Sequence, residues 1–343
     1  MRCNIRQIKV LATSVCNSEC THCFRKEDSE DFLMPKDKLI EIIDFAVRNS
    51  VKIISFSGGE FFTHPNAYEV LEYCFSKKIH TRILTNAKDL DIDFFAKRIK
   101  ANDFSFQVSI DGLKVNHDRR RGEGSFDATI NNVKKLAEAG IRITAKVTLD
   151  ENNYQDIVDI IKIPYFDDFS ILPVVLVNED NLRETINSDY EATIKLIYRE
   201  QESGKHSQKG RCINCMTAIA IKYNGDAFPC PECREHNIFC IGNILERSLE
   251  SILGDMDDDL YNNITRHANM DIVECNSCES KDICDRGCRV RAYKYYGKFL
   301  APDPFCCKVF KNKHKGEVVG NLFFGKKLKQ VGKHEKSKHN TNY

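Results

Sequence analysis

Between residues 8 and 173 the chain alternates short apolar runs with amphipathic runs of helical period, and this alternation constrains the fold more than any other feature. Strands that alternate with helices of this length form a parallel sheet with right-handed crossovers. Six such units favour an α/β fold built as a partial or full (β/α)6 barrel over a doubly wound sheet, and barrels carry their chemistry at the carboxyl ends of the strands. The strands are expected at 8–12, 52–57, 81–85, 104–110, 141–149 and 169–177, and the helices at 36–48, 67–75, 91–99, 127–139 and 154–161.

Three cysteines, Cys16, Cys20 and Cys23, stand directly after the first expected strand. A [4Fe–4S] cluster takes one ligand for each iron, so three thiolates leave one iron open to a small molecule. The alternative is a zinc site, for which His22 inside the motif would supply the fourth ligand. The spacing alone leaves both interpretations open, whereas the position at the end of a strand favours the cluster.

Polar motifs also follow later strands. Gly58, Gly59 and Glu60 end the second expected strand, although a glycine pair after a strand is by itself often only a tight turn. Ser109 ends the fourth strand and precedes an Asp-Gly turn, and three arginines follow at 119–121. A basic run of this kind is commonly a solvated loop.

With these motifs together, the chain resembles the radical SAM enzymes. The sequence CNSECTHC at 16–23 is similar to their cluster signature, and SGGE at 57–60 is similar to their glycine-rich motif. In that family the open iron binds the amino and carboxylate groups of S-adenosylmethionine. One electron from the cluster then breaks the sulfonium C–S bond and releases a 5′-deoxyadenosyl radical. A flavodoxin- or ferredoxin-type protein is the expected electron donor.

The resemblance also implies roles for individual residues. Gly58, Gly59 and Glu60 would hold the methionine amino group of the cofactor. Ser109 and one downstream arginine would contact its carboxylate and ribose, and among the three adjacent arginines we favour Arg121. Together with the three cysteines, these residues make up the predicted cofactor site of the barrel.

Eleven of the 16 cysteines lie between residues 205 and 310, in a region with few long periodic segments. Many cysteines in a cytosolic chain indicate metal binding, so we expect a second domain organised by metal. Two CxxC pairs, at 212–215 and 275–278, would also fit zinc ribbons. The spacing as a whole resembles the seven-cysteine pattern of SPASM domains, which extend many peptide-modifying radical SAM enzymes and hold two auxiliary [4Fe–4S] clusters.

The SPASM resemblance implies that the ligands of the two clusters are interleaved along the chain. Cys288 lies close in sequence to the ligands of the second cluster but would serve the first. Metal binding would therefore hold together a region that has little hydrophobic core of its own. Cys233 and Cys240 are expected to be structural thiols. By this resemblance the first cluster takes Cys215, Cys230 and Cys288, with Cys212 as a possible fourth ligand, and the second takes Cys275, Cys278, Cys284 and Cys306.

Four segments are expected along the chain: a core barrel at 1–188, a connecting helix at 189–204, a cluster domain at 205–310, and a basic tail at 311–343. The sequence contains no apolar run of 18 residues and no signal peptide, so we expect a cytoplasmic protein without a membrane partner. The net charge is +1, and the sequence does not predict a basic surface across the fold of the kind that binds nucleic acid.

Auxiliary clusters suit oxidative or cross-linking chemistry, and the main hypothesis is hydrogen abstraction from a ribosomally made peptide. A sulfatase-maturing, formylglycine-forming enzyme is an alternative, but Pro231 follows Cys230 where that group has an aspartate base, and Glu232 is displaced by one position. A second alternative is a dehydrogenase or epimerase that acts on a small molecule. A first strand at residue 8 would leave no room for the N-terminal peptide-recognition domain that some peptide maturases carry. The last alternative is a non-catalytic iron–sulfur or zinc protein, but such a protein would not need an iron with an open coordination position.

Three clusters of four irons predict about 12 iron atoms per chain after anaerobic reconstitution. Iron and zinc analysis of the reconstituted protein measures this directly. A value near four iron atoms, with zinc also bound, would contradict the two auxiliary clusters and favour zinc ribbons in the second cysteine block.

Overall fold

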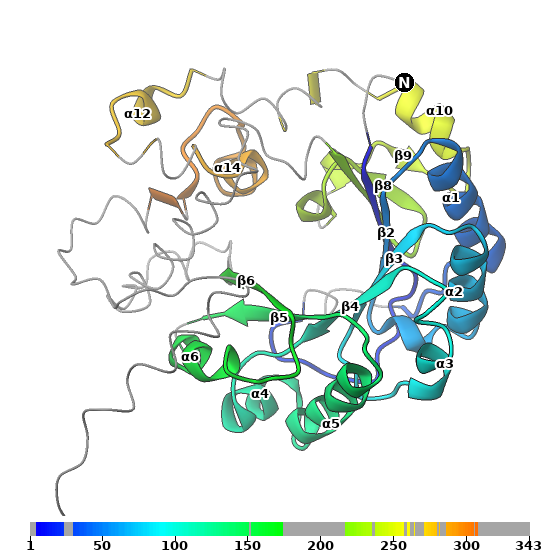
Figure 1. Ribbon diagram of the computed structural model, residues 1–343. Coiled ribbons are helices and arrows are strands. Elements are labelled where there is room, and N and C mark those ends of the chain that lie inside the picture. The colour runs from blue at the N-terminus through cyan, green and yellow to red at the C-terminus, as the bar shows by residue number, and fades with distance from the viewer. Residues whose placement is uncertain are drawn as a thin grey trace, which may run out of the picture.

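In a computed structural model of the chain, six parallel strands form a curved sheet with helices on its outer face (Figure 1). The structure describes residues 5–23, 30–150, 152–173, 217–234, 237–256, 259–260, 264, 271–279, 281, 286–304 and 306–307. All six predicted strands are present, and the prediction of a partial barrel is confirmed. They are β1 (Gln7–Leu11), β2 (Ile53–Ser57), β3 (His80–Thr85), β4 (Phe104–Ser109), β5 (Ile143–Leu149) and β6 (Asp168–Pro173).

The strand order is β6-β5-β4-β3-β2-β1, so each strand pairs in parallel with the one before it in sequence. The sheet continues beyond β1, because β7 pairs with β1 in parallel and then β8 and β9 add antiparallel strands. The cysteine-rich region therefore begins as an extension of the barrel sheet, which the sequence pattern does not predict. These strands are β7 (Ala218–Ile221), β8 (Asp226–Phe228) and β9 (Gly242–Asn243).

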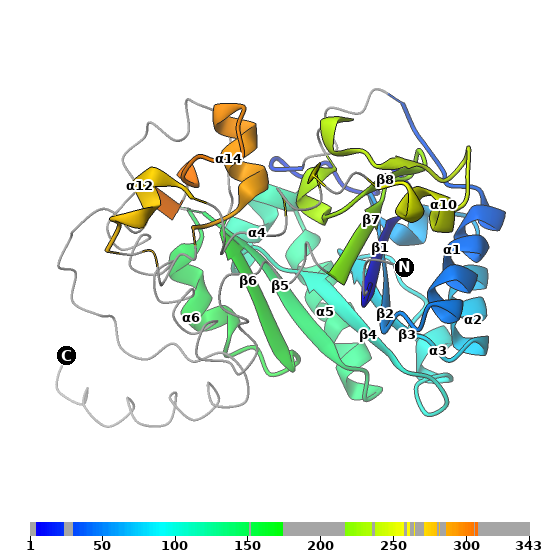
Figure 2. The ribbon, with the colours of Figure 1, turned by 90° about the horizontal axis from the view of Figure 1, so that it is seen from above.

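Helices α1 to α6 cover the outer face of the sheet, while α12 and α14 lie together on the β6 side (Figures 1 and 2). The arginine run, for which a loop was an alternative, forms the last turn of helix α4, where its positive charges also favour the carbonyl end of the helix. The connecting helix expected at 189–204 lies outside the described residues. Within the described part of the chain, no helix has the length and apolarity needed to cross a membrane. The helices are α1 (Lys36–Arg48), α2 (Ala67–Ser76), α3 (Ile92–Ala96), α4 (Lys114–Arg121), α5 (Ser125–Glu138), α6 (Ile157–Ile160), α10 (Leu249–Gly254), α12 (Val273–Asn276) and α14 (Arg289–Tyr296).

The two faces of the sheet differ in polarity. Along β5 every second residue from Ile143 to Leu149 is a buried apolar side chain of the main core, whereas Thr144, Lys146 and Thr148 are polar and only half-buried. This alternation follows from the pleat of a strand, with one face toward the helices and the other toward the barrel interior. The inner face has the same polar character on neighbouring strands, with Gln7, Lys9, Ser55, Ser57, Arg82, Ser105, Gln107, Ser109 and Ser170.

Gly58 and Gly59 allow the loops after β1 and β2 to meet at backbone distance. The Gly59 amide donates to the Thr13 carbonyl at 2.7 Å, and the Glu60 amide donates to the Val15 carbonyl at 2.9 Å. A side chain at Gly59 would collide with the backbone of Val15, and Gly58 has φ +149°, which favours glycine. The pair therefore fixes the position of the cysteine loop.

Gly59→Ala is expected to destabilise the chain by about 2 kcal/mol, because the new methyl group meets backbone that cannot move aside cheaply. Gly254→Ala is the matched control, since nothing lies within 4 Å of a side chain added there. Urea unfolding of the purified variants measures both. Equal stability of the two variants would show that the contact between the loops is not tight.

Candidate functional site

The cysteines of the first motif lie in the loop after β1, at the carboxyl edge of the sheet. Cys20 is buried, and Cys16 and Cys23 are half-buried. The Cys23 amide donates to the Cys20 carbonyl at 3.2 Å, and the Thr21 amide donates to the Arg120 carbonyl of helix α4 at 2.9 Å. The loop is thus docked on the helix that follows β4.

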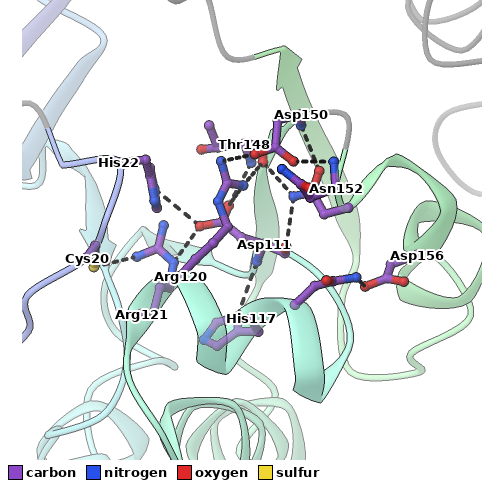
Figure 3. A network of polar contacts seen from close by, with 12 residues as sticks. Cys20, His22, Asp111, His117, Arg120, Arg121, Thr148, Asp150, Asn152 and Asp156 are labelled. Carbon is purple, nitrogen blue, oxygen red and sulfur yellow. Dashed lines mark hydrogen bonds and ion pairs between the residues drawn. The ribbon is translucent and has the colours of Figure 1, made fainter. Parts of the chain in front are cut away.

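Asp111, two residues after β4, is fully buried and is the centre of a polar network (Figure 3). Its Oδ2 accepts a hydrogen bond from Arg121 Nε at 2.6 Å and lies 3.4 Å from His22 Nε2. Its Oδ1 accepts from the Thr148 amide at 2.8 Å and lies 4.0 Å from Arg120 Nη1. One carboxylate therefore joins the ends of β4 and β5, helix α4 and the cysteine loop.

Arg121 connects this network to the cysteines, because its Nη1 donates to Cys20 Sγ at 3.9 Å. Burial raises the pKa of the Cys20 thiol, and the Arg121 charge opposes that rise. Arg120 lies behind Arg121 and donates to the Thr148 carbonyl at 2.5 Å, whereas Arg119 is exposed. Of the three adjacent arginines, the structure thus places Arg121 against the cysteine loop.

Charge and burial oppose each other in this network. Burial alone would raise the pKa of Asp111, but Arg121, His22 and Arg120 outweigh it and hold that pKa below its ordinary value. Burial lowers the pKa of His22 to about 4, and that of His117 to about 4 as well, so both imidazoles are neutral near pH 7. Within the described residues, the Nδ1 atom of His22 is buried and has no hydrogen-bond partner.

Glu60 closes the network on the side of β2 and β3. Its buried carboxylate accepts hydrogen bonds from the Asn86 amide at 2.8 Å and the Phe62 amide at 3.4 Å. Asn86 in turn donates through Nδ2 to Asn17 Oδ1 of the cysteine loop at 2.7 Å. Burial raises the pKa of Glu60, although the Asn86 amide opposes the rise.

The donor set fits the cofactor that the first motif predicts. The Glu60 carboxylate suits an ammonium group, and the Arg121 guanidinium suits a carboxylate or a thiolate. Ser109 lies on the inner face at the end of β4, beside Lys146 of β5. In the part of the chain that the structure describes, no three Cys, His, Asp or Glu side chains converge as a single metal ion requires. The assignment of individual cluster ligands stays a prediction.

In the second cysteine block, Cys230, Cys233 and Cys288 lie in one apolar cluster. The structure thus brings together two of the cysteines predicted for the first auxiliary cluster, and with them Cys233, which was expected to be structural. A hydrogen bond with Cys230 and burial raise the pKa of Cys233. Three other predicted ligands lie outside the described residues, namely Cys212, Cys215 and Cys284.

Asp303 joins predicted ligands of both auxiliary clusters. Its buried carboxylate accepts hydrogen bonds from the Cys288 amide at 2.6 Å and the Cys306 amide at 3.3 Å, and from Arg291 Nη2 at 2.5 Å. Burial would raise the pKa of Asp303, but the charge of Arg291 outweighs it and lowers that pKa. Of the remaining predicted ligands, Cys275 is buried and Cys278 is half-buried.

Asp111 and Asn17 are the site residues that the motifs did not reveal. An Asp-Gly pair after a strand indicates a turn, and this interpretation hid the role of the carboxylate. The signal that distinguishes it is its place at the carboxyl end of a barrel strand, next to a cationic run.

Comparison with known families agrees with this geometry. Residues 10–163 match the model of the Radical SAM superfamily, and residues 212–279 match the model of the SPASM iron-sulfur cluster-binding domain. The chain belongs to the radical SAM superfamily and carries a SPASM domain. Its cofactors are therefore [4Fe–4S] clusters and S-adenosylmethionine.

Several curated proteins are similar along most of the chain. Fe-coproporphyrin III synthase of Methanosarcina barkeri is 26% identical, over 86% of each protein. A cysteine-type anaerobic sulfatase-maturating enzyme of Clostridium novyi is 26% identical, over 81% of this chain and 86% of the relative. The subtilosin biosynthesis protein AlbA of Bacillus subtilis is 26% identical, over 70% of this chain and 57% of AlbA. Among solved structures, Streptococcus suis SuiB bound to S-adenosylmethionine shares the fold, with TM-score 0.68 and 22% identity over 87% of this chain and 76% of SuiB.

Asp111→Asn is expected to destabilise the chain by about 3 kcal/mol at neutral pH, because the Arg121 guanidinium loses its carboxylate partner, whereas Arg120 keeps Asp150. The pKa of Asp111 is lowered in the folded chain, so its contribution is complete above the ordinary aspartate pKa of about 3.9 and declines as the pH falls below it. The variant is expected to lack this part of the acid sensitivity.

Urea unfolding between neutral and acidic pH measures both effects. Asp127→Asn is the control, because Asp127 pairs with Lys114 on the exposed surface and such pairs contribute little. If the two variants were equally stable at neutral pH, Asp111 would not organise the site.

Proposed function

We propose that this chain is a maturase that abstracts hydrogen from a ribosomally made peptide and leaves an oxidative or cross-linking modification. The observation that carries the proposal is the network that joins the cysteine loop to Arg121, Asp111 and Glu60 at the carboxyl edge of the barrel. When bound, the cluster and S-adenosylmethionine supply the electron and the oxidising power to remove hydrogen from an unactivated carbon.

The residues of the network have distinct roles in this proposal. Cys16, Cys20 and Cys23 ligate the cluster. Arg121, held by Asp111, keeps a positive charge beside Cys20 and would pair with the carboxylate of the cofactor. The buried Glu60 offers negative charge to its ammonium group, and Gly58 and Gly59 shape the loop that brings these groups together, with Ser109 as a further contact.

A peptide substrate is supported by relatives and by the second cysteine block. AlbA acts in the biosynthesis of a bacteriocin, and SuiB has been solved with the precursor peptide SuiA bound. The gathered Cys230, Cys233 and Cys288 support an auxiliary cluster close to the barrel, which would take an electron from a substrate radical.

The proposal does not extend to formylglycine formation. The base position after Cys230 is occupied by Pro231, which begins a short 3₁₀ turn ending at Cys233. Glu232 is the nearest carboxylate in sequence, but its side chain is exposed. Similarity to the sulfatase-maturating relative therefore supports the shared fold and cofactors more than the shared substrate.

A carboxylate-rich small molecule is the second candidate substrate. The M. barkeri relative, an Fe-coproporphyrin III synthase, matches over most of its own length, whereas AlbA matches over 57% of its length.

Cys16→Ala is expected to abolish formation of 5′-deoxyadenosine from S-adenosylmethionine under reducing, anaerobic conditions, because a cluster ligand is lost. Cys74→Ala is the matched control, since Cys74 is a buried core thiol of helix α2. Removal of the basic tail from residue 311 onward is also expected to leave this activity in place. Wild-type rates in Cys16→Ala would overturn the proposal.

The two substrate candidates are separated by mass spectrometry of the products. A short peptide encoded beside the gene is expected to lose hydrogen atoms in the presence of the enzyme, S-adenosylmethionine and a reductant. Formation of Fe-coproporphyrin III from a tetrapyrrole precursor, with the peptide left unchanged, would instead select the second candidate.

A further inference from the structure

Two lysines stand on the inner face of the barrel, on strands β1 and β5, which are separated in the sheet by β2, β3 and β4. Lys9 is the middle residue of β1 and pairs in register with Ser55 of β2. Lys146 lies on β5, between Ser109 of β4 and Ser170 of β6. Both side chains are half-buried, although lysine is normally exposed unless it is paired.

Neither lysine has a carboxylate partner in the described part of the chain. Among the described residues, the ammonium group of Lys9 makes no hydrogen bond or ion pair, and that of Lys146 donates only to Ser170 Oγ, at 3.2 Å. Asp111 is near Lys146, but its oxygens are taken by arginines and a backbone amide. An ammonium group that is partly withdrawn from water without a counter-ion is unfavourable, which makes this pair costly for stability alone.

Positive charge exceeds negative charge around Lys9 and Lys146. Burial lowers the pKa of Lys9 to about 8, and the charge of Arg234 lowers it further against an opposing effect of Glu232. Burial also lowers the pKa of Lys146 to about 8, and Lys9 contributes to that decrease. Lys9 thus adds to the positive charge at Lys146, and an anion held on this inner face of the sheet would offset the charge of both lysines.

The position of the pair relates it to both predicted cofactor regions. Lys146 stands two residues before Thr148, whose amide binds Asp111, so its side chain lies about 7 Å below that network on the same face of the strand. Lys9 pairs in register with Ala220 of β7, and Ala220 lies in the same buried cluster as Cys230, a predicted ligand of the first auxiliary cluster. A molecule anchored here would lie between the site of radical formation and the second cysteine block.

We propose that Lys9 and Lys146 form an anion-binding site inside the barrel that recognises carboxylate groups of the substrate. The inference rests on the proposed radical function and deepens it, because it names the chemistry by which the substrate is held. Glutamate or aspartate side chains of a peptide and the carboxylates of a small molecule both supply this chemistry, and the probes below distinguish them.

The test is calorimetric titration of the full, reconstituted chain with S-adenosylmethionine present. One probe pair is the capped peptide Ac-Glu-Ala-Ala-Glu-NH2 and its twin with glutamine in place of glutamate. The other is pimelate and pimelamide, which represent a small dicarboxylate and its neutral analogue. We expect binding of at least one carboxylate probe and none of the neutral twins, and the probe that binds identifies the source of the carboxylate.

Lys9→Met and Lys146→Met are each expected to weaken that binding about tenfold or more, the effect of losing one hydrogen bond between charged groups. Lys146→Arg keeps the charge and is expected to retain most of the affinity. Lys162→Met is the matched control, because Lys162 is exposed and pairs only with Asp159. Iron content and thermal unfolding of each variant verify that it is folded.

Binding of neither carboxylate probe at millimolar concentration would overturn the inference, as would binding that the two methionine variants leave unchanged. Formation of 5′-deoxyadenosine by the wild-type preparation is measured in parallel. If that activity is present and no probe binds, the anion site alone is wrong. If the activity is absent, the proposed radical function fails independently of the binding result.

Discussion

The buried carboxylate of Asp111 is the interaction on which the candidate site depends. It sits where β4 ends, and it accepts the Thr148 amide of β5 and the guanidinium of Arg121 at once. A buried charge of this kind is tolerated only when it is fully paired, and here the partners come from three separate segments: the cysteine loop, helix α4 and β5. The position of the cysteine loop, of helix α4 and of two strand ends is therefore coupled to one side chain.

The second cysteine block repeats this principle with Asp303. That carboxylate binds the backbone of Cys288 and Cys306, which are predicted to serve different clusters. Short helices and few apolar side chains characterise this region, so a buried acid paired with Arg291 supplies order that its small core does not. The pairing of β7 with β1 then connects the region to the strand that leads into the first cysteine loop.

The sequence predicts the strands and the order of the barrel well, because one buried face and one polar face give a clear period along β4 and β5. Helix α4 was missed because its sequence is almost entirely polar, and tertiary contacts of His117 and Arg120 decide its conformation. The union of β7 with the barrel sheet could not be predicted, since strand pairing between distant segments leaves no local signal. Within the site, the motifs single out Glu60 and Arg121, whereas the central place of Asp111 in the network is seen only in the three-dimensional contacts.

The polar inner face of the barrel has a consequence for how such a protein changes over time. The apolar core of the barrel is formed between the outer face of the sheet and its helices, so residues that point inward contribute little to folding free energy. Exchanges on the inner face, unlike those at Gly59 or Asp111, can accumulate without loss of the fold. A common radical-generating edge can thus be retained while the interior is adapted to new molecules, which separates the evolution of specificity from the evolution of stability.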